Sequence, residues 1–254
     1  KDSFVPGMEL RAKYTVFAEG CRGHLGKQLI KQFELDKDKS PQHYALGFKE
    51  IWDVPAEQHQ PGLVVHSAGW PLANDTSGGG YLYHAENQQI LVGLIVDLNY
   101  SNPYLNPFEE FQRYKQHPVI SQYLAGGKRV SYGARAIAKG GLNSLPKMSF
   151  NGGLLVGCDA GYMNAARIKG SHAAMKSGML CAEAVFEAVT GGRQHDELTA
   201  YPKLFEQSWL HDELKTSKNF KTWFKKGFYV GTIMTAVEHW LLPRLGMKEA
   251  PWTL

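Results

Sequence analysis

The sequence predicts a mixed α/β fold, in which a βα unit is interrupted by a largely antiparallel sheet and completed by a long helix and a helical tail. Three observations lead to this prediction. Residues 152–189 have the order of a strand, a glycine-rich turn and a helix. Residues 41–135 contain a series of strand-like apolar runs, and residues 198–254 have a helical pattern.

The βα unit of residues 152–189 begins with the short apolar run Leu154–Val156, bounded by glycines, which is typical of a strand buried on both faces. Gly157 and Gly161 then allow backbone angles and close approaches that a side chain would block. Ser171 is the expected N-cap of a helix whose apolar residues recur at helical spacing until Gly191-Gly192.

The start of this helix lies beside basic residues, Arg167 and Lys169. A helix N-terminus presents unpaired N–H groups and roughly half a positive charge, so an electron-rich ligand is expected there. The alternative is an ordinary βα crossover with a solvated basic loop.

A second βα unit lies at the start of the chain. Residues 15–20 (TVFAEG) predict a strand that ends at Gly20, and residues 22–33 predict a helix with Leu25, Leu29 and Phe33 at four-residue steps. An ordinary βα turn at Glu19-Gly20 is the alternative to a ligand-binding one.

Between these units the pattern changes to strands, with one helix that begins after Asn106 and carries Glu109 and Glu110 in its first turn. The predicted strands are 43–54, 62–65, 80–84 and 90–99. We therefore expect a largely antiparallel sheet inserted between the two βα units.

In the tail, residues 225–245 are apolar with basic flanks and contain Glu238 as their one acidic residue. The run is shorter than the about 20 apolar residues that a spanning helix needs, and Pro243 ends it. Aromatic residues between Lys226 and Arg244 favour a segment that lies on a bilayer surface, with membrane contacts by Phe228, Tyr229, Trp240 and Leu241. A buried core helix is the alternative.

Composition agrees with a folded protein and narrows its partners. Of the 254 residues, 43% are hydrophobic and 20% charged, which excludes wholesale disorder. The net charge of +4 is too small to argue for nucleic acid, although it suits an anionic membrane surface. The three scattered cysteines argue against disulfides and are too few for a four-thiolate cluster, so no metal site is expected in this chain.

The segment GCDAGYMNAARIKGSHAAMKSGM resembles the second flavin-contacting segment of the electron transfer flavoprotein–ubiquinone oxidoreductase family. Further pieces resemble the same family in the same order: TVFAEGCRGHLGKQL at 15–29, HSAGWPL at 66–72, TSGGGYLYH at 76–84, NPYLNPFEEFQ at 102–112, GGKRVSYGARAI at 126–137, GGLNSLPKMSFNGG at 140–153 and APWTL at 250–254. This collinearity over nearly the whole chain makes the resemblance specific.

The resemblance implies a partial glutathione-reductase-like FAD-binding domain with an inserted quinone-binding domain. The expected division is 1–40 and 136–197 for the FAD-binding domain, 41–135 for the ubiquinone-binding insert, and 198–254 for a helical, membrane-associated segment. The family's G-x-G-x-x-G turn and its cysteine-rich [4Fe–4S] domain do not occur in this sequence. We therefore interpret the chain as the central part of a longer protein, with the cluster outside it.

The resemblance also implies the residues that contact FAD: Glu19, Gly20, Gly157, Asp159, Gly161, Lys169, Gly170 and Ser171. Asp159 is the expected ribityl partner, although Cys158 occupies the place where the pattern has its acidic residue. The backbone of Lys169-Gly170-Ser171 is expected to face the pyrimidine edge of the flavin. His172 is interpreted as structural, and no side chain is expected to be catalytic, since electrons pass between cofactors.

The expected quinone site comprises Gly78 and Gly79, with Tyr81 and Tyr83 as apolar walls. Glycines suit a flat ring that needs backbone donors without Cβ atoms in the way. Ser77 and Gly80 depart from the family's pattern, and a mobile hairpin loop is the alternative.

The implied function is FAD-dependent transfer of electrons from reduced electron transfer flavoprotein to membrane ubiquinone. The implied location is peripheral, on the bacterial cytoplasmic membrane or the matrix side of the mitochondrial inner membrane. Two alternatives stay open: a flavin-dependent reductase of the geranylgeranyl-reductase type, and a non-catalytic quinone- or lipid-binding module.

Overall fold

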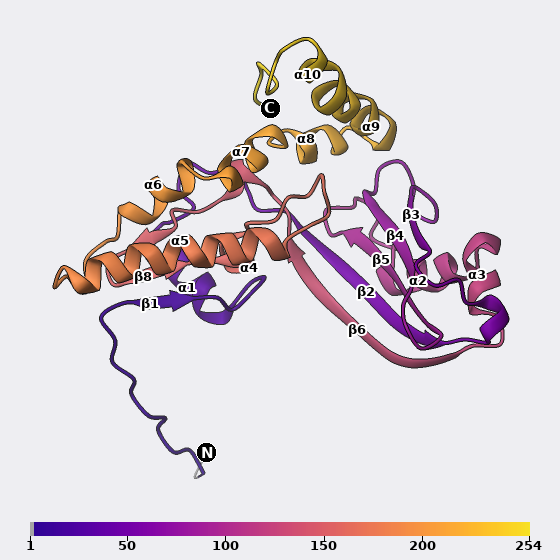
Figure 1. Ribbon diagram of the computed structural model, residues 1–254, viewed down its shortest axis with the longest axis horizontal. Helices are drawn as coiled ribbons and strands as arrows, with labels where there is room; N and C mark the ends of the chain where they lie inside the picture. The colour runs from indigo at the N-terminus through magenta and orange to yellow at the C-terminus, as the bar shows by residue number, and fades with distance from the viewer. Residues whose placement is uncertain (1–2) are drawn as a thin grey trace.

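The structure is a computed structural model that describes residues 3–254. It contains two sheets that lie side by side, with a helical tail above their junction (Figure 1). The smaller sheet has the order β1-β8-β7 and the larger one the order β3-β4-β5-β2-β6. The fold is therefore mixed α/β, as the sequence predicts.

The smaller sheet brings the two predicted βα units together. Strand β1 (Thr15–Phe17) pairs in parallel with β8 (Gly153–Leu155), which pairs antiparallel with β7 (Ser149–Phe150). Their buried side chains share a core with Leu180, Cys181 and Ala184 on α5 (Ser171–Thr190). The other helices of this half are α1 (His24–Gln32), α4 (Gly157–Ala160), α6 (Ala200–Glu206) and α7 (Trp209–Thr216).

Every pairing in the larger sheet is antiparallel, which confirms the predicted antiparallel sheet. Its strands are β2 (Tyr44–Asp53), β3 (Val64–Ala68), β4 (Gly78–His84), β5 (Gln89–Asp97) and β6 (Lys128–Ala138). The glycine cluster Gly78-Gly79-Gly80 belongs to β4, so the alternative of a mobile hairpin loop is wrong.

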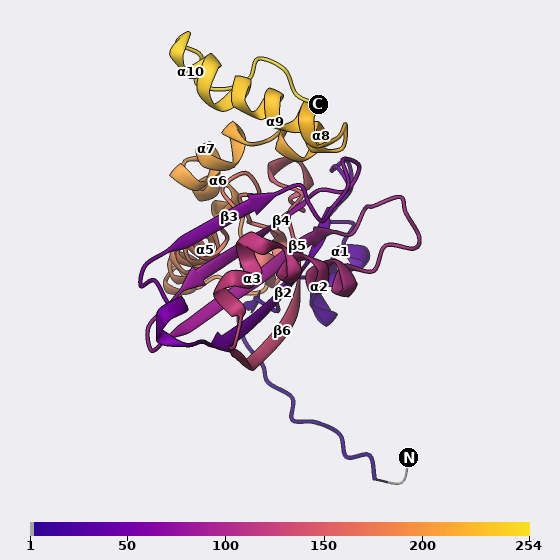
Figure 2. The ribbon, with the colours of Figure 1, turned by 90° about the vertical axis from the view of Figure 1, so that its right-hand side faces the viewer.

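Helices α2 (Pro107–Gln116) and α3 (Pro118–Leu124) cover one face of the larger sheet (Figure 2). Phe111, Tyr114 and Ile120 are buried in the same core as Leu82, Val92 and other strand residues. The opposite face of the larger sheet is therefore turned away from this core. The side chain of Asn106 accepts a hydrogen bond from the N–H of Phe108, as the predicted cap requires. A short 3₁₀ turn, η1 (Ala56–Gln58), contacts α3, whereas a second one, η2 (Leu142–Ser144), packs against the core of the smaller sheet.

The tail consists of α8 (Phe220–Phe224), α9 (Phe228–Ala236), a π-helical stretch (Val237–Leu241) and α10 (Leu242–Arg244). The last three follow one another without a break in helical conformation. Within residues 3–254, no helix has both the length and the apolar character to cross a membrane.

Element boundaries differ from the predictions at several ends. Helix α1 is shorter than the predicted 22–33, and the predicted strand 62–65 is displaced to Val64–Ala68. Gly170, not Ser171, is the N-cap of α5, and no side chain caps this helix. Because Ser171 already has helical geometry, it lies inside the first turn, where its hydroxyl cannot take the N-cap role.

Candidate functional site

A cavity of about 550 Å³ lies between the exposed face of the larger sheet, the loop that precedes α5, and helices α8 and α9. Its walls therefore come from three parts of the sequence that are far apart. Side chains of Phe220, Phe224 and Phe228 form the apolar wall on the tail side. Met163, Ala165 and Ile168 form the wall on the loop side. This volume falls in the range of about 300–1,000 Å³ that small-molecule sites occupy.

The sheet wall contains all four residues of the predicted quinone site, Gly78, Gly79, Tyr81 and Tyr83. Successive residues of a strand face opposite sides. Gly79, Tyr81 and Tyr83 therefore face the cavity, whereas Leu82 faces the core under α2. The rings of Tyr81 and Tyr83 stack with their centroids 4.9 Å apart.

The β4 glycines also have packing roles of their own. A Cβ on Gly78 would lie 2.3 Å from the backbone oxygen of Ile95, and one on Gly79 would lie 2.7 Å from that of Ser67. Gly79 pairs with both β3 and β5, whereas Gly78 pairs with β5 alone. Close strand packing by itself thus explains these glycines.

Gly47 of β2 lines the same cavity and differs from the β4 glycines in its surroundings. It pairs with Ile95, which in turn pairs with Gly79, so the three residues form one row across the sheet. A Cβ on Gly47 would have ordinary contacts, the nearest being Ile137 Cδ1 at 3.5 Å. A side chain added there would therefore enter the cavity without displacing the backbone.

At one end of the cavity, two lysines contact one buried carboxylate. Asp97 is 1% exposed; its Oδ1 accepts a hydrogen bond from Lys139 Nζ at 2.7 Å, and its Oδ2 accepts one from Lys221 Nζ. We call these three residues the Lys–Asp–Lys triad. Burial, together with the neighbouring charge of Lys139, lowers the pKa of Lys221 despite the attraction of Asp97.

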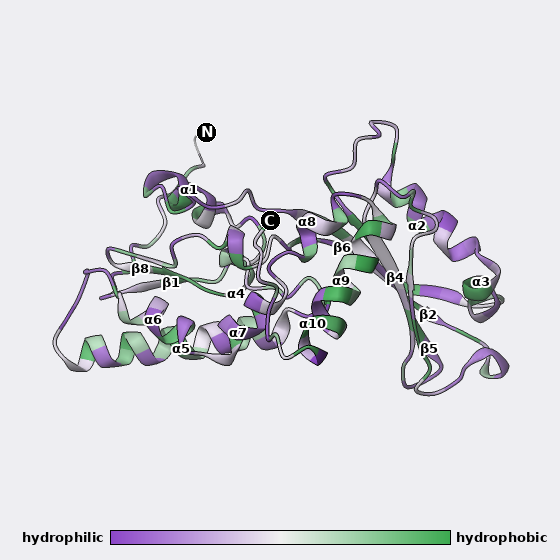
Figure 3. Cartoon of the chain, turned by 90° about the horizontal axis from the view of Figure 1, so that it is seen from above, coloured by the Kyte–Doolittle hydropathy of each residue, from purple (hydrophilic) through white to green (hydrophobic). Residues whose placement is uncertain are grey.

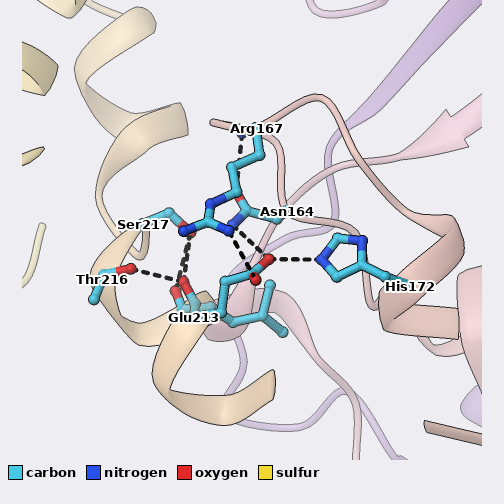
Figure 4. Close-up of polar contacts among 7 residues, drawn as sticks. Asn164, Arg167, His172, Glu213, Thr216 and Ser217 are labelled. Carbon is cyan, nitrogen blue, oxygen red and sulfur yellow. Dashed lines mark hydrogen bonds and ion pairs between the residues drawn. The ribbon is translucent and has the colours of Figure 1, made fainter. Parts of the chain in front are cut away.

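The loop between α4 and α5 is fastened to α7 by Glu213 (Figure 4). Its carboxylate accepts hydrogen bonds from Asn164 Nδ2 at 3.0 Å and Arg167 NH1 at 3.3 Å, and His172 Nε2 lies 2.8 Å from it. His172 also stacks on Trp209, at 5.8 Å between ring centroids. These contacts set the position of the α5 N-terminus.

Of the predicted flavin contacts, Lys169, Gly170 and Ser171 lie at this N-terminus, and Lys169 lines the 550 Å³ cavity. The first hydrogen bond within α5 is donated by the N–H of Ala174 to the carbonyl oxygen of Gly170. The N–H groups of the residues just before Ala174 therefore have no acceptor within the helix. The geometry suits an electron-rich group.

Glu19 and Asp159 lie together at the start of α1. Glu19 Oε2 accepts hydrogen bonds from the N–H groups of Leu25 at 2.9 Å and Gly26 at 2.8 Å. Glu19 therefore caps α1 in the structure. Asp159 is buried, and its Oδ2 has no hydrogen-bond partner among the described residues.

Asp159 lines a second cavity of about 300 Å³ together with Arg22, Tyr44 and Cys158. Burial and the charge of Glu19 raise the pKa of Asp159. An unpaired buried carboxylate oxygen fits a hydroxyl donor, which is the group that the ribityl chain of FAD would offer.

Three predicted cofactor-site glycines have positive φ angles: Gly20 at 86°, Gly157 at 60° and Gly161 at 94°. These are left-handed conformations that a side chain disfavours, so the turns require glycine. The N–H of Gly157 donates to Ser177 Oγ at 2.9 Å, which fixes the turn against α5.

The predicted membrane residues do not all lie on one surface. Tyr229, Ile233, Trp240 and Leu241 are exposed. Figure 3 shows that much of α9 is hydrophobic. Phe228 is half-buried and lines the cavity, because it packs against Phe224. The exposed apolar surface and the cavity thus share helix α9.

The Lys–Asp–Lys triad and Glu213 were not predicted from the sequence. Asp97 is a single acidic residue at the end of the apolar run of β5, and this position could have indicated a buried carboxylate. In the sequence around Lys221 and Glu213, nothing distinguishes these two residues from surface residues. In the structure, the predicted flavin contacts of residues 157–171 come from two elements, the α4 turn with Asp159 and the N-terminus of α5 beside Lys169. Within residues 3–254, no three His, Cys, Asp or Glu side chains are placed to hold a metal ion.

The fold is similar to those of a reductase-like protein and of a flavin-dependent brominase. The chain superposes on a geranylgeranyl bacteriochlorophyll reductase-like protein from Thermoplasma acidophilum with a TM-score of 0.62 and 15% identity, over 93% of this chain and 62% of that one. A flavin-dependent brominase gives a TM-score of 0.56 and 14% identity, over 95% of this chain and 58% of the other.

Sequence comparison identifies the family. Residues 44–137 match the family described as "ETF-QO, ubiquinone-binding". The chain is 66% identical over 218 residues to electron transfer flavoprotein-ubiquinone oxidoreductase of Pseudomonas aeruginosa, covering 85% of this chain and 40% of that protein. It is 47% identical to the human mitochondrial protein of that name, covering 100% of this chain and 42% of the other. The resemblance to the electron transfer flavoprotein–ubiquinone oxidoreductase family is therefore confirmed, and the chain spans less than half the length of these relatives.

Proposed function

We propose that this chain is part of an FAD-dependent oxidoreductase that passes electrons from reduced electron transfer flavoprotein to membrane ubiquinone. The proposed division follows the sequence: 1–40 and 136–197 contribute to the FAD-binding domain, 41–135 bind ubiquinone, and 198–254 contact the membrane. The [4Fe–4S] cluster would lie in another part of the full-length protein.

One observation carries the proposal: the cavity of about 550 Å³ joins the glycine-rich sheet face to the apolar tail. A quinone has a flat polar head and a hydrocarbon tail, so its site needs a smooth wall for the ring and an apolar exit towards lipid. Gly47 and Gly79 supply a wall without side chains, with Tyr81 and Tyr83 beside it. Phe224 and Phe228 extend the cavity to the tail, whose exposed side chains are apolar.

FAD would be held by the two groups of residues described above. The unpaired oxygen of Asp159 would accept a hydrogen bond from a ribityl hydroxyl, and the N-terminus of α5 at Lys169, Gly170 and Ser171 would face the electron-rich edge of the ring. Bound FAD supplies the one-electron chemistry. The chain's own residues position it, and Glu213 fastens the loop beside it to α7.

The tail supports a peripheral location. Tyr229, Ile233, Trp240 and Leu241 expose apolar surface next to the cavity, which suits a helix lying at the lipid headgroups. On this proposal the protein sits on the bacterial cytoplasmic membrane or on the matrix side of the mitochondrial inner membrane.

Replacing Gly47 by leucine in the full-length protein tests the quinone site. The new side chain enters the cavity without a backbone clash. We expect quinone reduction to fall by about tenfold or more, because overpacking costs about 1–3 kcal/mol. Reduction of the bound flavin by electron transfer flavoprotein should be unchanged.

The matched control is Gly133→Leu, on the same sheet face but outside the cavity, where a Cβ meets only Lys49 Cε at 3.9 Å. This variant should reduce quinone normally. Normal quinone reduction by a folded Gly47→Leu variant would contradict the assignment. Gly79→Leu should also abolish activity, but it is less decisive because it disturbs the pairing of β3 with β4.

A further inference from the structure

We propose that the Lys–Asp–Lys triad is the group that stabilises negative charge on the quinone head during its reduction. This inference rests on the function proposed above and assigns that function's charge-stabilising residues. It follows from the place of Lys139, Asp97 and Lys221 in the cavity and from their combined charge.

The triad lies next to the glycine row of the sheet wall. Asp97 follows Ile95 by two residues on β5, and Lys139 follows Ile137 by two residues at the end of β6. Since strand side chains alternate, each faces the same side as the cavity-lining residue before it. Gly79 pairs with Ile95, so Asp97 is one row further along the same face. Lys221 reaches this point from α8.

The three charges do not cancel. Two ammonium groups contact one carboxylate, which leaves a net charge of +1. Asp97 is the sole carboxylate within ion-pair distance of either lysine among residues 3–254. The side chains of Lys221 and Lys139 are only 6% and 13% exposed. Uncompensated charge in a buried site is costly unless a ligand of opposite sign shares it.

Neighbouring groups do not supply that opposite sign. Burial and the charges of Lys225 and Lys221 lower the pKa of His43 to about 4, so this imidazole is neutral at pH 7. Arg135, Lys49 and Lys169 also line the cavity, and each is basic. The site is therefore prepared for an anion or for a group that becomes one.

Quinone reduction creates such a group. The neutral head accepts one electron from the reduced enzyme and becomes an oxyanion radical. A second electron and two protons, taken from water, then give the quinol. Ammonium groups fixed beside the oxygen stabilise the first product more than the neutral quinone, and in a site of low dielectric this effect is large. The triad therefore acts on the charged state rather than on binding of the quinone.

The first test is Lys221→Met in the full-length protein, which brings the triad to a net charge of zero. With a short-tailed ubiquinone analogue as acceptor, kcat should fall by at least about tenfold, as when one donor to a developing oxyanion is removed. KM should change by less than about threefold, since neutral quinone gains little from the charge. The radical yield at partial reduction, measured by electron paramagnetic resonance, should fall with kcat.

Lys226→Met is the matched control, because it removes a lysine just after α8 that is exposed and does not line the cavity. It should retain the parental kcat and radical yield. Reduction of the bound flavin by electron transfer flavoprotein should be the same in parent and variants.

A second pair of variants separates charge from folding. Lys139→Met alone leaves a net charge of zero, whereas Lys139→Met with Asp97→Asn restores +1 on Lys221. The double variant should recover quinone turnover to within about threefold of the parent, while the single variant should lose at least about tenfold. If Lys221→Met does not fold, Lys139→Met replaces it, because this variant also brings the triad to a net charge of zero.

Parental kcat and radical yield in a folded Lys221→Met variant would overturn the role of the triad and leave the proposed function in place. So would a double variant that stays as slow as Lys139→Met. Failure of the parent protein to reduce the quinone with electron transfer flavoprotein as donor would instead overturn the proposed function.

Discussion

Asp159 shows how a single carboxylate can be unfavourable for the protein alone and favourable with a ligand. Its Oδ2 is buried without a partner, and Glu19 is close enough to raise its pKa further after burial. The carboxylate of Glu19 already accepts hydrogen bonds from N–H groups of α1, so it does not provide a partner for the Oδ2 of Asp159. A hydroxyl donor from FAD would satisfy the free oxygen.

We predict that Asp159→Asn weakens FAD retention about tenfold or more, because a hydrogen bond to a charged group is worth about 1.5–3 kcal/mol. In the parent, the raised pKa means that the carboxylate is protonated on acidification sooner than an ordinary aspartate, so FAD release should begin at a correspondingly higher pH. Fluorescence of the released flavin against pH measures this. Identical pH profiles for parent and variant would contradict the role of Asp159.

The contact between α7 and the loop before α5 depends on Glu213. Burial alone would raise its pKa, but hydrogen bonds from His172 and Asn164 and the charge of Arg167 hold the pKa below its usual value. A carboxyl whose folded pKa is depressed contributes stability above its unfolded pKa of about 4.3 and loses it as the pH falls.

Glu213→Gln should therefore lower the free energy of unfolding at pH 7 by about 1–2 kcal/mol, since the pairs to charged groups are lost. The difference between parent and variant should shrink as the pH falls below about 4. Urea unfolding at several pH values measures it. A difference that grows on acidification would show that Glu213 does not act as an anion here.

The helix formed by α9, the π-helical stretch and α10 has the exposed apolar side chains of the tail. We predict that Ile233→Glu with Trp240→Glu releases the protein from liposomes, because each substitution replaces apolar contact with a charge at the interface. Flotation with vesicles measures the bound fraction.

Phe186→Glu on α5 is the control for this surface. Phe186 and Trp240 are equally exposed, at 71%, but Phe186 lies on a different helix. The control variant should still float with the vesicles. Equal loss in both cases would mean that binding depends on general surface hydrophobicity and not on the tail.

At the scale of the whole molecule, the cavity exists only while the tail stays packed over the sheet. Glu238 holds the tail together: its Oε1 accepts hydrogen bonds from Asn219 Nδ2 at 3.0 Å, Trp223 Nε1 at 2.9 Å and Trp252 Nε1 at 2.7 Å. Asn219 directly precedes α8, Trp223 belongs to it, and Trp252 is among the last residues of the chain, which Figure 1 shows beside α8.

Glu238→Ala should therefore destabilise the tail by about 2–3 kcal/mol, because the partly buried Nε1 groups of Trp223 and Trp252 lose their acceptor and Asn219 loses one of two. Quinone reduction and vesicle binding should both fall, while FAD stays bound. Limited proteolysis of residues 217–254 measures the loosening. Glu249→Ala removes a surface ion pair with Lys215 in the same region and should have little effect.

The sequence allowed prediction of most elements and of the residues that form the sheet wall. Alternating and continuous apolar runs identified β2, β4 and β5, and the cap residue Asn106 located α2. Boundaries at α1 and β3 were displaced, because helix and strand ends depend on pairing partners that the local sequence does not specify.

The roles of Glu19, Phe228 and the triad could not be read from the sequence. Glu19 caps α1 because the chain turns back on it, and Phe228 faces the cavity because α8 directs α9 over the sheet. In the sequence, Asp97 is 42 residues from Lys139 and 124 residues from Lys221. The three side chains nevertheless meet in one cluster.

The sequence by itself determined the family, the antiparallel sheet, the helix N-terminus at residues 169–171 and the apolar tail, since each is encoded by local spacing or by a collinear set of motifs. The tertiary structure alone decided that the glycine row, the loop before α5 and the tail enclose one cavity, and that this cavity has a net positive charge. The physical reason is that a buried ion cluster and a cavity wall are properties of long-range packing, and the side chains that form them carry no local signal.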